Sequence, residues 1–132
     1  MATMKEVCTQ LDLSYETLKY YCNEGLVPNH TRDKNNHRIF SEKDIQWISG
    51  LLCLRDCGMS IKDMKQYMAY AYEGMDSILK RKAMLEETKQ DLEARLSVIQ
   101  RSLDFIDTKQ QYYDDVLAGK IALTSNLNLD EA

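Results

Sequence analysis

Basic and aromatic side chains gather in two short stretches of the sequence, and their chemistry suits phosphate binding. Lys19 and Tyr20 are adjacent in "TLKYYCNEGLVP", and Arg32, Lys34 and Arg38 face a single acid in "HTRDKNNHR". Ammonium, guanidinium and phenol groups all donate hydrogen bonds to phosphate oxygens. The net charge of −4 argues mildly against nucleic acid as a partner, but a local basic patch binds phosphate even on an acidic protein.

The cysteines lack the spacing of a metal site. Cys8, Cys22, Cys53 and Cys57 include no Cys-x-x-Cys pair, and both histidines lie far from them in the sequence. No nucleophile and base form a recognisable catalytic pattern, and no glycine-rich phosphate loop occurs. We therefore expect no metal, no cofactor and no enzymatic activity.

Length and composition indicate one globular domain, or a small domain with an extension. The chain has 132 residues, of which 44% are hydrophobic and 29% charged. The whole acidic excess lies in the second half, since residues 1–68 carry equal numbers of basic and acidic side chains. No apolar run approaches the roughly 20 residues of a membrane helix, and "MATMKEV" is not a signal peptide. We expect a cytoplasmic protein, in which disulfides are rare.

The first two predicted helices form a helix-turn-helix. The first covers residues 5–11, and the second covers 15–24 between an N-cap at Ser14 and a left-handed C-cap at Gly25. On the second helix Tyr21 lies on the apolar face and is predicted to be buried, whereas Lys19 and Tyr20 face outward as phosphate donors. An exposed aromatic without a role remains the alternative for Tyr20.

Two capping signatures predict a third and a fourth helix. The third begins at Ser41 and runs to residue 57, and the fourth begins at Ser60, covers residues 61 to about 72 and ends near Gly74. Between the second and third helices, residues 27–40 read as a hairpin with "RDKNN" as its turn and "HRIF" as a short strand. The apolar side of the third helix is predicted to include Ile45, Ile48 and Leu52, with Cys53 as a further candidate.

The second half follows a heptad pattern. Two series that alternate by three and four residues are typical of a coiled coil, and no Pro or Gly interrupts residues 76–118. A helix of that span is on the order of 60 Å long, too long for this small chain to cover, so we expect a homodimer. A helix folded back in a monomer remains the alternative. The predicted dimerisation residues are Ile78, Leu85, Leu92, Leu96, Ile99, Leu103 and Ile106.

The segment "TLKYYCNEGLVP…HRIFSEKDIQWISGLLCLRDCGMSIKDM" resembles the DNA-binding domain of MerR-type transcription regulators. That family has paired aromatics before Gly-Leu, a basic hairpin ending in aromatic-Arg-x-aromatic, and then Ser-x-x-Asp-Ile/Leu. The resemblance covers residues 4–70 and, with the trailing helix, reaches about residue 117. It implies a mainly α fold, with a winged helix-turn-helix DNA-binding domain over residues 1–74, a coiled-coil dimerisation helix over 75–118 and a short tail over 119–132.

The resemblance also implies which residues contact DNA. The hairpin becomes a wing and the turn at residues 58–62 a second one, where the free amides of the fourth helix suit a phosphate. Arg38 keeps the family's place, while Lys19 stands for the usual Arg, Cys22 for a common acid and His37 for an aromatic. Tyr15 and Glu16 are placed to reach base edges. The expected DNA-binding residues are Tyr15, Glu16, Thr17, Lys19, Tyr20, Arg32, Arg38, Ser60 and Lys62.

The partner implied by this resemblance is double-stranded promoter DNA, bound by a homodimer at an inverted-repeat operator. Regulators of this type sit on promoters with an overlong spacer and distort the DNA when activated, so they reach RNA polymerase indirectly through the promoter. No membrane partner is expected.

Cys53 is the candidate sensor. The run "DIQWISGLLCLRDCGMSI" resembles regulators of the subgroup that answers aldehyde, carbonyl or nitrosative stress, in which a cysteine at this place is the proposed sensor. Its activation needs a group that lowers the thiol pKa, either a helix N-terminus or a cation such as Arg55 or a Lys or Arg of the partner subunit. A core role for Cys53 remains open, Cys57 is the second choice, and Cys8 and Cys22 look like core residues. No cysteine follows Cys57, so metal sensing is not expected.

Two other classes of function remain open. A DNA-architectural or recombination-directionality protein uses the same winged helix without an inducer, but such proteins are usually shorter and lack the long coiled coil. A non-DNA interaction module held together by the coiled coil would have no operator and no salt-dependent affinity for DNA.

Overall fold

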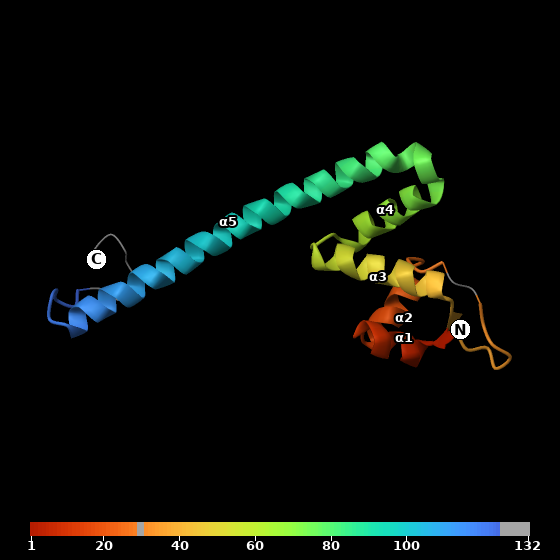
Figure 1. Cartoon of the computed structure of the whole chain (residues 1–132), viewed down its shortest axis with the longest axis horizontal. Helices are drawn as coiled ribbons and strands as arrows, with labels where there is room; N and C mark the ends of the chain where they lie inside the picture. The colour runs from red at the N-terminus through yellow and green to blue at the C-terminus, as the bar shows by residue number, and fades with distance from the viewer. Residues whose placement is uncertain (29–30, 125–132) are drawn as a thin grey trace. The chain divides into compact units, whose positions relative to one another are not determined.

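The computed structural model describes residues 1–28 and 31–124, and Figure 1 follows their elements along the chain. The fold is mainly α, as predicted. Residues 1–89 form one compact unit and the chain from residue 90 onward forms a second, and each is described by itself. The elements are β1 (Ala2–Thr3), α1 (Met4–Leu11), α2 (Tyr15–Asn23), β2 (Ile39–Phe40), α3 (Glu42–Asp56), α4 (Ile61–Glu73), the 3₁₀ helix η1 (Gly74–Ser77) and α5 (Ile78–Leu117).

Side-chain caps place the helix starts close to where the sequence predicts them. Ser14, Ser41 and Ser60 are N-caps, and each hydroxyl accepts a hydrogen bond from the backbone N–H three residues later. Thr3 and Glu6 form a full capping box, so α1 begins one residue before its predicted start. These bonds satisfy amides that have no partner inside a helix.

The end of α2 is also where the sequence places it. Gly25 has φ 77°, and the next residue, Leu26, donates its N–H back to the carbonyl of Tyr21 at 3.0 Å. This is the bonding pattern of a Schellman cap, in which a left-handed residue is most easily a glycine. The chain therefore turns out of the helix at one defined point and leads towards the wing.

The predicted turn is present, and the predicted strand forms over a shorter range than "HRIF". Among the described residues of the hairpin, Ile39–Phe40 forms the strand β2, and it pairs antiparallel with β1, an element that the sequence did not indicate. Arg32 and Arg38 form a single bridge between the arms of the hairpin. The carboxylate of Asp33 accepts N–H groups from Asn35 and His37, which closes the turn over residues 33–37. We call residues 31–38 the wing.

A continuous core holds the short elements of residues 1–89 together. Tyr21 is buried as predicted, and the indole N–H of Trp47 donates to the carbonyl of Leu26 at 2.8 Å, which ties α3 to the segment that follows α2. The buried apolar residues are Val7, Leu13, Leu18, Tyr21, Leu26, Val27, Phe40, Ile45, Ile48, Leu51, Leu54, Met59, Met64 and Met68.

The predicted apolar side of α3 needs one correction. Ile45 and Ile48 are buried as expected, but the next buried positions are Leu51 and Leu54, while Leu52 is only half-buried. Residues three apart share a face of a helix, so the observed series is a regular continuation from Ile48. The run is apolar on nearly every side at this point, which is why its pattern alone does not select the buried face.

The helix α5 has forty residues and begins after a 3₁₀ turn rather than at residue 76. The seven predicted dimerisation residues are all exposed in the single chain, from 37% for Ile78 and Leu92 to 65% for Leu96. The domain boundary at residues 74/75 stays a prediction, and residues 125–132 of the predicted tail lie outside the described residues. None of the helices that the structure describes combines the length and apolar content of a bilayer span.

We predict that Phe40→Ala destabilises the protein by about 3–5 kcal/mol, because the ring is fully buried and its loss leaves a cavity. Thermal and urea unfolding followed by circular dichroism would measure the change. Phe105→Ala is the matched control, since Phe105 is 40% exposed on α5, and it should change stability by less than about 1 kcal/mol. Equal losses in both variants would contradict the assignment of the core.

Candidate nucleic-acid interface

The outer face of α2 presents most of the residues predicted to contact DNA. Tyr15 and Tyr20 are 53% and 41% exposed, and Glu16 and Lys19 are exposed beside them. Thr17 differs, because it is half-buried and its hydroxyl accepts a hydrogen bond from the N-cap Ser14 at 2.8 Å. A shallow hollow runs along this face, lined by Glu16, Lys19, Tyr20, Asn23 and Glu24.

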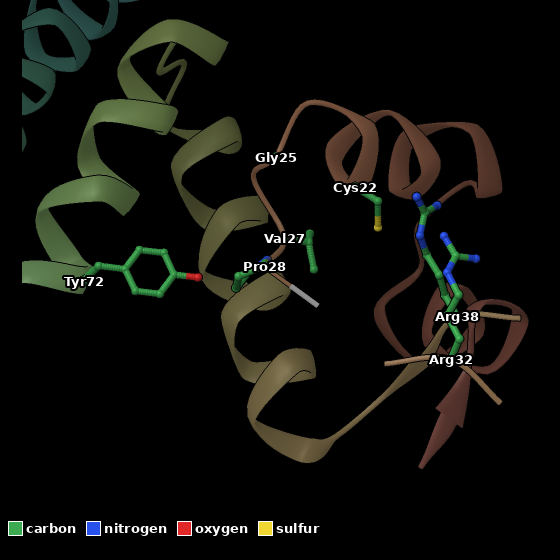
Figure 2. Close-up of a pocket in the computed structure, with 7 residues that line it drawn as sticks. All are labelled: Cys22, Gly25, Val27, Pro28, Arg32, Arg38 and Tyr72. Atoms are coloured by element: carbon green, nitrogen blue, oxygen red, sulfur yellow. The ribbon is translucent and has the colours of Figure 1, made fainter. Parts of the chain in front are cut away.

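The two wing arginines lie beside the end of α2 (Figure 2). The guanidinium of Arg38 donates to the side-chain oxygen of Asn23 at 3.2 Å, and that of Arg32 donates to the backbone carbonyl of Asn36 at 2.9 Å. Both arginines border a cavity whose other lining residues are Cys22, Gly25, Val27, Pro28 and Tyr72. The hydrogen bond to Asn23 therefore holds a basic group of the wing against the helix expected to read DNA.

A second hollow joins the wing to the start of α2. It is lined by Met4, Tyr15, Arg32, Asn36, His37 and Arg38. Tyr15 at the first turn of α2 and both wing arginines thus belong to one surface. A phenol and two guanidinium groups on a common surface can donate several hydrogen bonds to neighbouring phosphates.

The shape of the wing depends on Asp33. Its carboxylate accepts the backbone N–H groups of Asn35 and His37, each at 2.9 Å, and Asn36 takes a left-handed conformation with φ 65°. The hydrogen bond from the His37 amide is the main reason that the pKa of Asp33 is lowered. A lowered carboxyl pKa means that this support is present above the unfolded-state pKa and is lost as the pH falls through the folded value. The wing turn is accordingly set at neutral pH.

The predicted second wing lies on the turn between α3 and α4. Ser60 caps α4 through its hydroxyl and, like Lys62, is exposed. Neither residue lines the two hollows of α2 and the first wing. An ion pair of 3.4 Å between Lys65 and Glu24 links α4 to the C-terminal end of α2.

The sequence places Asn23 on the outer face of the second helix, but neither Asn23 nor Asn36 was among the predicted DNA-binding residues. Asn23 provides the acceptor for Arg38 across fifteen positions of the chain, a contact that no local pattern indicates. Asn36 had a usable signal, because asparagine is one of the few residues that adopt a left-handed turn conformation readily.

The cysteines occupy different environments. Cys53 is exposed on α3, so the alternative that it belongs to the core is wrong for the single chain. Arg55, suggested as its activating cation, instead directs its guanidinium to Asp56, with nitrogen–oxygen distances of 3.3 and 3.2 Å. Cys8 and Cys22 are half-buried and pack against the core. Among the described residues, no group of three or more His, Cys, Asp or Glu is gathered as a metal site.

Burial raises the pKa of the Cys22 thiol, against the opposing effect of the nearby Arg38 and Arg32 charges. The neutral thiol therefore predominates at neutral pH, and Cys22 is a poor nucleophile there. Packing against the core explains the position of Cys22 near the wing arginines better than a role as a reactive thiol.

Residues 2–71 match the family model described as "MerR HTH family regulatory protein". The chain belongs to the MerR family. An HTH-type transcriptional regulator of Haemophilus influenzae is 34% identical over 116 residues, which cover 88% of this chain and 86% of the relative. The regulator AdhR of Bacillus subtilis is also 34% identical, over 87 residues that cover 66% of this chain and 62% of that protein.

Solved structures of MerR proteins have the same fold. HiNmlR, described as a MerR family regulator lacking the sensor domain and bound to promoter DNA, has a TM-score of 0.77, 34% identity and 88% coverage of both chains. A MerR family regulator from Bacillus thuringiensis has a TM-score of 0.71 and 27% identity over 84% of this chain and 97% of its own. This chain is thus a MerR-family DNA-binding transcription regulator, and the architectural and non-DNA alternatives fall away.

We predict that Arg38→Ala weakens binding of this MerR protein about equally on all DNA sequences, by roughly tenfold, because an arginine on a phosphate reads no sequence information. The slope of log affinity against log salt should become shallower by about 0.9 for each phosphate that the variant no longer neutralises. Fluorescence anisotropy over a salt series measures both quantities. Arg101→Ala, at an exposed arginine of α5, is the matched control and should leave the slope unchanged.

Asn23→Ala tests separately how the position and the charge of Arg38 contribute to DNA affinity. This variant keeps the guanidinium but removes its anchor on α2, so affinity should fall by only a few fold while the salt slope stays that of the unmodified protein. A salt slope that fell as far in Asn23→Ala as in Arg38→Ala would contradict this role.

Proposed function

We propose that this MerR regulator acts as a homodimer at an inverted-repeat promoter operator, joined by the apolar stripe of α5. The observation that carries the proposal is the exposure of that stripe over the length of a forty-residue helix. Soluble proteins rarely leave an extended apolar surface uncovered, and a heptad pattern is covered best by another helix. Lys82, Lys89 and Gln110 interrupt the stripe and would set its register.

A twofold dimer accounts for the operator. Each protomer contributes one α2 and one wing, so the two recognition helices are related by the same twofold axis that relates the halves of an inverted repeat. Regulation then acts through the DNA, since a change in the separation of the two heads bends or untwists the spacer between them. RNA polymerase is affected through the altered promoter.

Cys53 is the proposed sensor of thiol-reactive electrophiles such as aldehydes. It is exposed on α3, and its place in the sequence resembles that of the proposed sensor in stress-responsive MerR regulators. With an aldehyde, the sulfur forms a bond to the carbonyl carbon, the carbonyl π electrons move to oxygen, and that oxygen takes a proton, which yields a hemithioacetal. The guanidinium of Arg55 pairs with the exposed carboxylate of Asp56, and we propose that a cation of the partner subunit promotes the thiolate.

Ile99→Glu should convert the dimer to a monomer at micromolar concentrations, since the substitution places a charge in the apolar seam. Val98→Glu is the matched control: it introduces the same charge at the preceding residue, outside the two heptad series, and should leave the dimer intact. Sedimentation equilibrium gives the mass of each variant. A monomeric unmodified protein, or an Ile99→Glu variant that remains dimeric, would overturn the proposed interface.

Cys53→Ser should abolish aldehyde-dependent transcription from the target promoter while DNA affinity stays unchanged, because serine lacks the nucleophilic thiolate. Transcription in vitro with and without aldehyde measures the response. Cys57→Ser, one turn along the same segment, should respond like the unmodified protein. Normal induction of Cys53→Ser would remove Cys53 from the mechanism.

A further inference from the structure

A cluster of hydrogen-bonded polar groups lies at the junction of α4 and α5, around the buried hydroxyl of Ser77. It consists of Tyr70, Gly74, Ser77 and Arg81, which we call the junction clamp. Ser77 is fully buried, with 0% exposure. A polar side chain is costly to bury unless it is hydrogen-bonded, so its partners show what the cluster holds together.

The clamp connects three consecutive elements. The Ser77 hydroxyl lies within hydrogen-bond reach of the carbonyl of Tyr70 in α4 and of the carbonyl of Gly74, the latter at 3.1 Å. The guanidinium of Arg81, on the first turn of α5, donates through Nε to the Ser77 hydroxyl at 3.1 Å and through a terminal nitrogen to the Gly74 carbonyl at 2.6 Å. Lys80 adds a second link, since its ammonium lies 5.3 Å from the centre of the Tyr70 ring.

The chemistry of a helix end explains these contacts. The last carbonyls of α4 have no partners inside the helix, and they carry partial negative charge. Arg81 directs its planar fork of donors to the carbonyl of Gly74, the residue that follows α4, and to the hydroxyl of Ser77, which constrains direction as well as distance. Gly74 has φ 72° and ψ −136°, a conformation open essentially to glycine alone, so the bend between the helices is placed at this residue.

We propose that Arg81, together with Ser77, is a positioning residue for operator recognition: it sets the direction in which α5 leaves the DNA-binding unit. Met64 and Met68 anchor α4 in the core that also buries the inner face of α2. The junction clamp and this core therefore connect the first turn of α5 to the recognition helix α2. This inference rests on the proposed homodimer. In such a dimer, the direction of α5 determines the separation of the two recognition helices and hence the preferred spacing of the half-sites.

The test compares Arg81→Ala and Ser77→Ala with the unmodified protein on operators whose half-sites are moved apart by single base pairs. Both variants should bind the best spacing roughly tenfold more weakly and should bind neighbouring spacings almost as well, since a looser junction has no single preferred separation. Affinity for an isolated half-site and the dimer mass should stay unchanged. Arg81→Lys keeps the charge but lacks the planar fork of donors, so its loss of spacing preference should be smaller than that of Arg81→Ala.

Arg101→Ala on α5 is the matched control and should keep the original spacing preference. A spacing profile of Arg81→Ala and Ser77→Ala identical to that of the unmodified protein would overturn the role of the clamp. The proposed dimer itself would be overturned if the unmodified protein were monomeric or bound operators of every spacing with equal affinity. Ser77→Ala removes a single oxygen, so it supplies the answer if Arg81→Ala does not fold.

Discussion

The burial of the inner face of α2 is the interaction on which the rest of this protein depends. A helix of nine residues is too short to be stable in water on its own. Leu18 and Tyr21 are 0% and 4% exposed, and their packing against the core supplies the stability that length cannot. Ser14 and Gly25 define the two ends of α2, so the directions of its outer side chains are fixed.

The capacity to bind phosphate depends on where the charged side chains lie and not on the net charge of the chain. Asp33 directly follows Arg32 and is the acid within the wing, yet its carboxylate accepts hydrogen bonds from the amides of its own turn. The described hydrogen bonds of Arg32 and Arg38 go instead to neutral oxygens, of Asn36 and Asn23. The wing therefore keeps its positive charge available for phosphate although the chain as a whole is acidic.

Polar groups at helix ends serve a common purpose throughout the DNA-binding unit. At the N-termini, serine and threonine hydroxyls satisfy free amides, and just after α4 the Ser77 hydroxyl and Arg81 donate to the carbonyl of Gly74. Both kinds of contact fix where a helix begins or ends and in which direction the chain leaves it. In the proposed homodimer, those directions matter as much as the contacts to DNA.

The sequence by itself determined the features that depend on neighbouring residues: the capped helices, the buried Tyr21, the wing turn and the heptads of α5. Only the tertiary structure decided the pairing of β1 with β2, the burial of Leu51 and Leu54 in place of Leu52, and the bond between Asn23 and Arg38. Caps and turns are set by hydrogen bonds three or four residues long, which a pattern records. Sheet partners, the buried side of an apolar helix and contacts across fifteen residues are chosen by packing, where many pairings satisfy the same local chemistry and the core selects one.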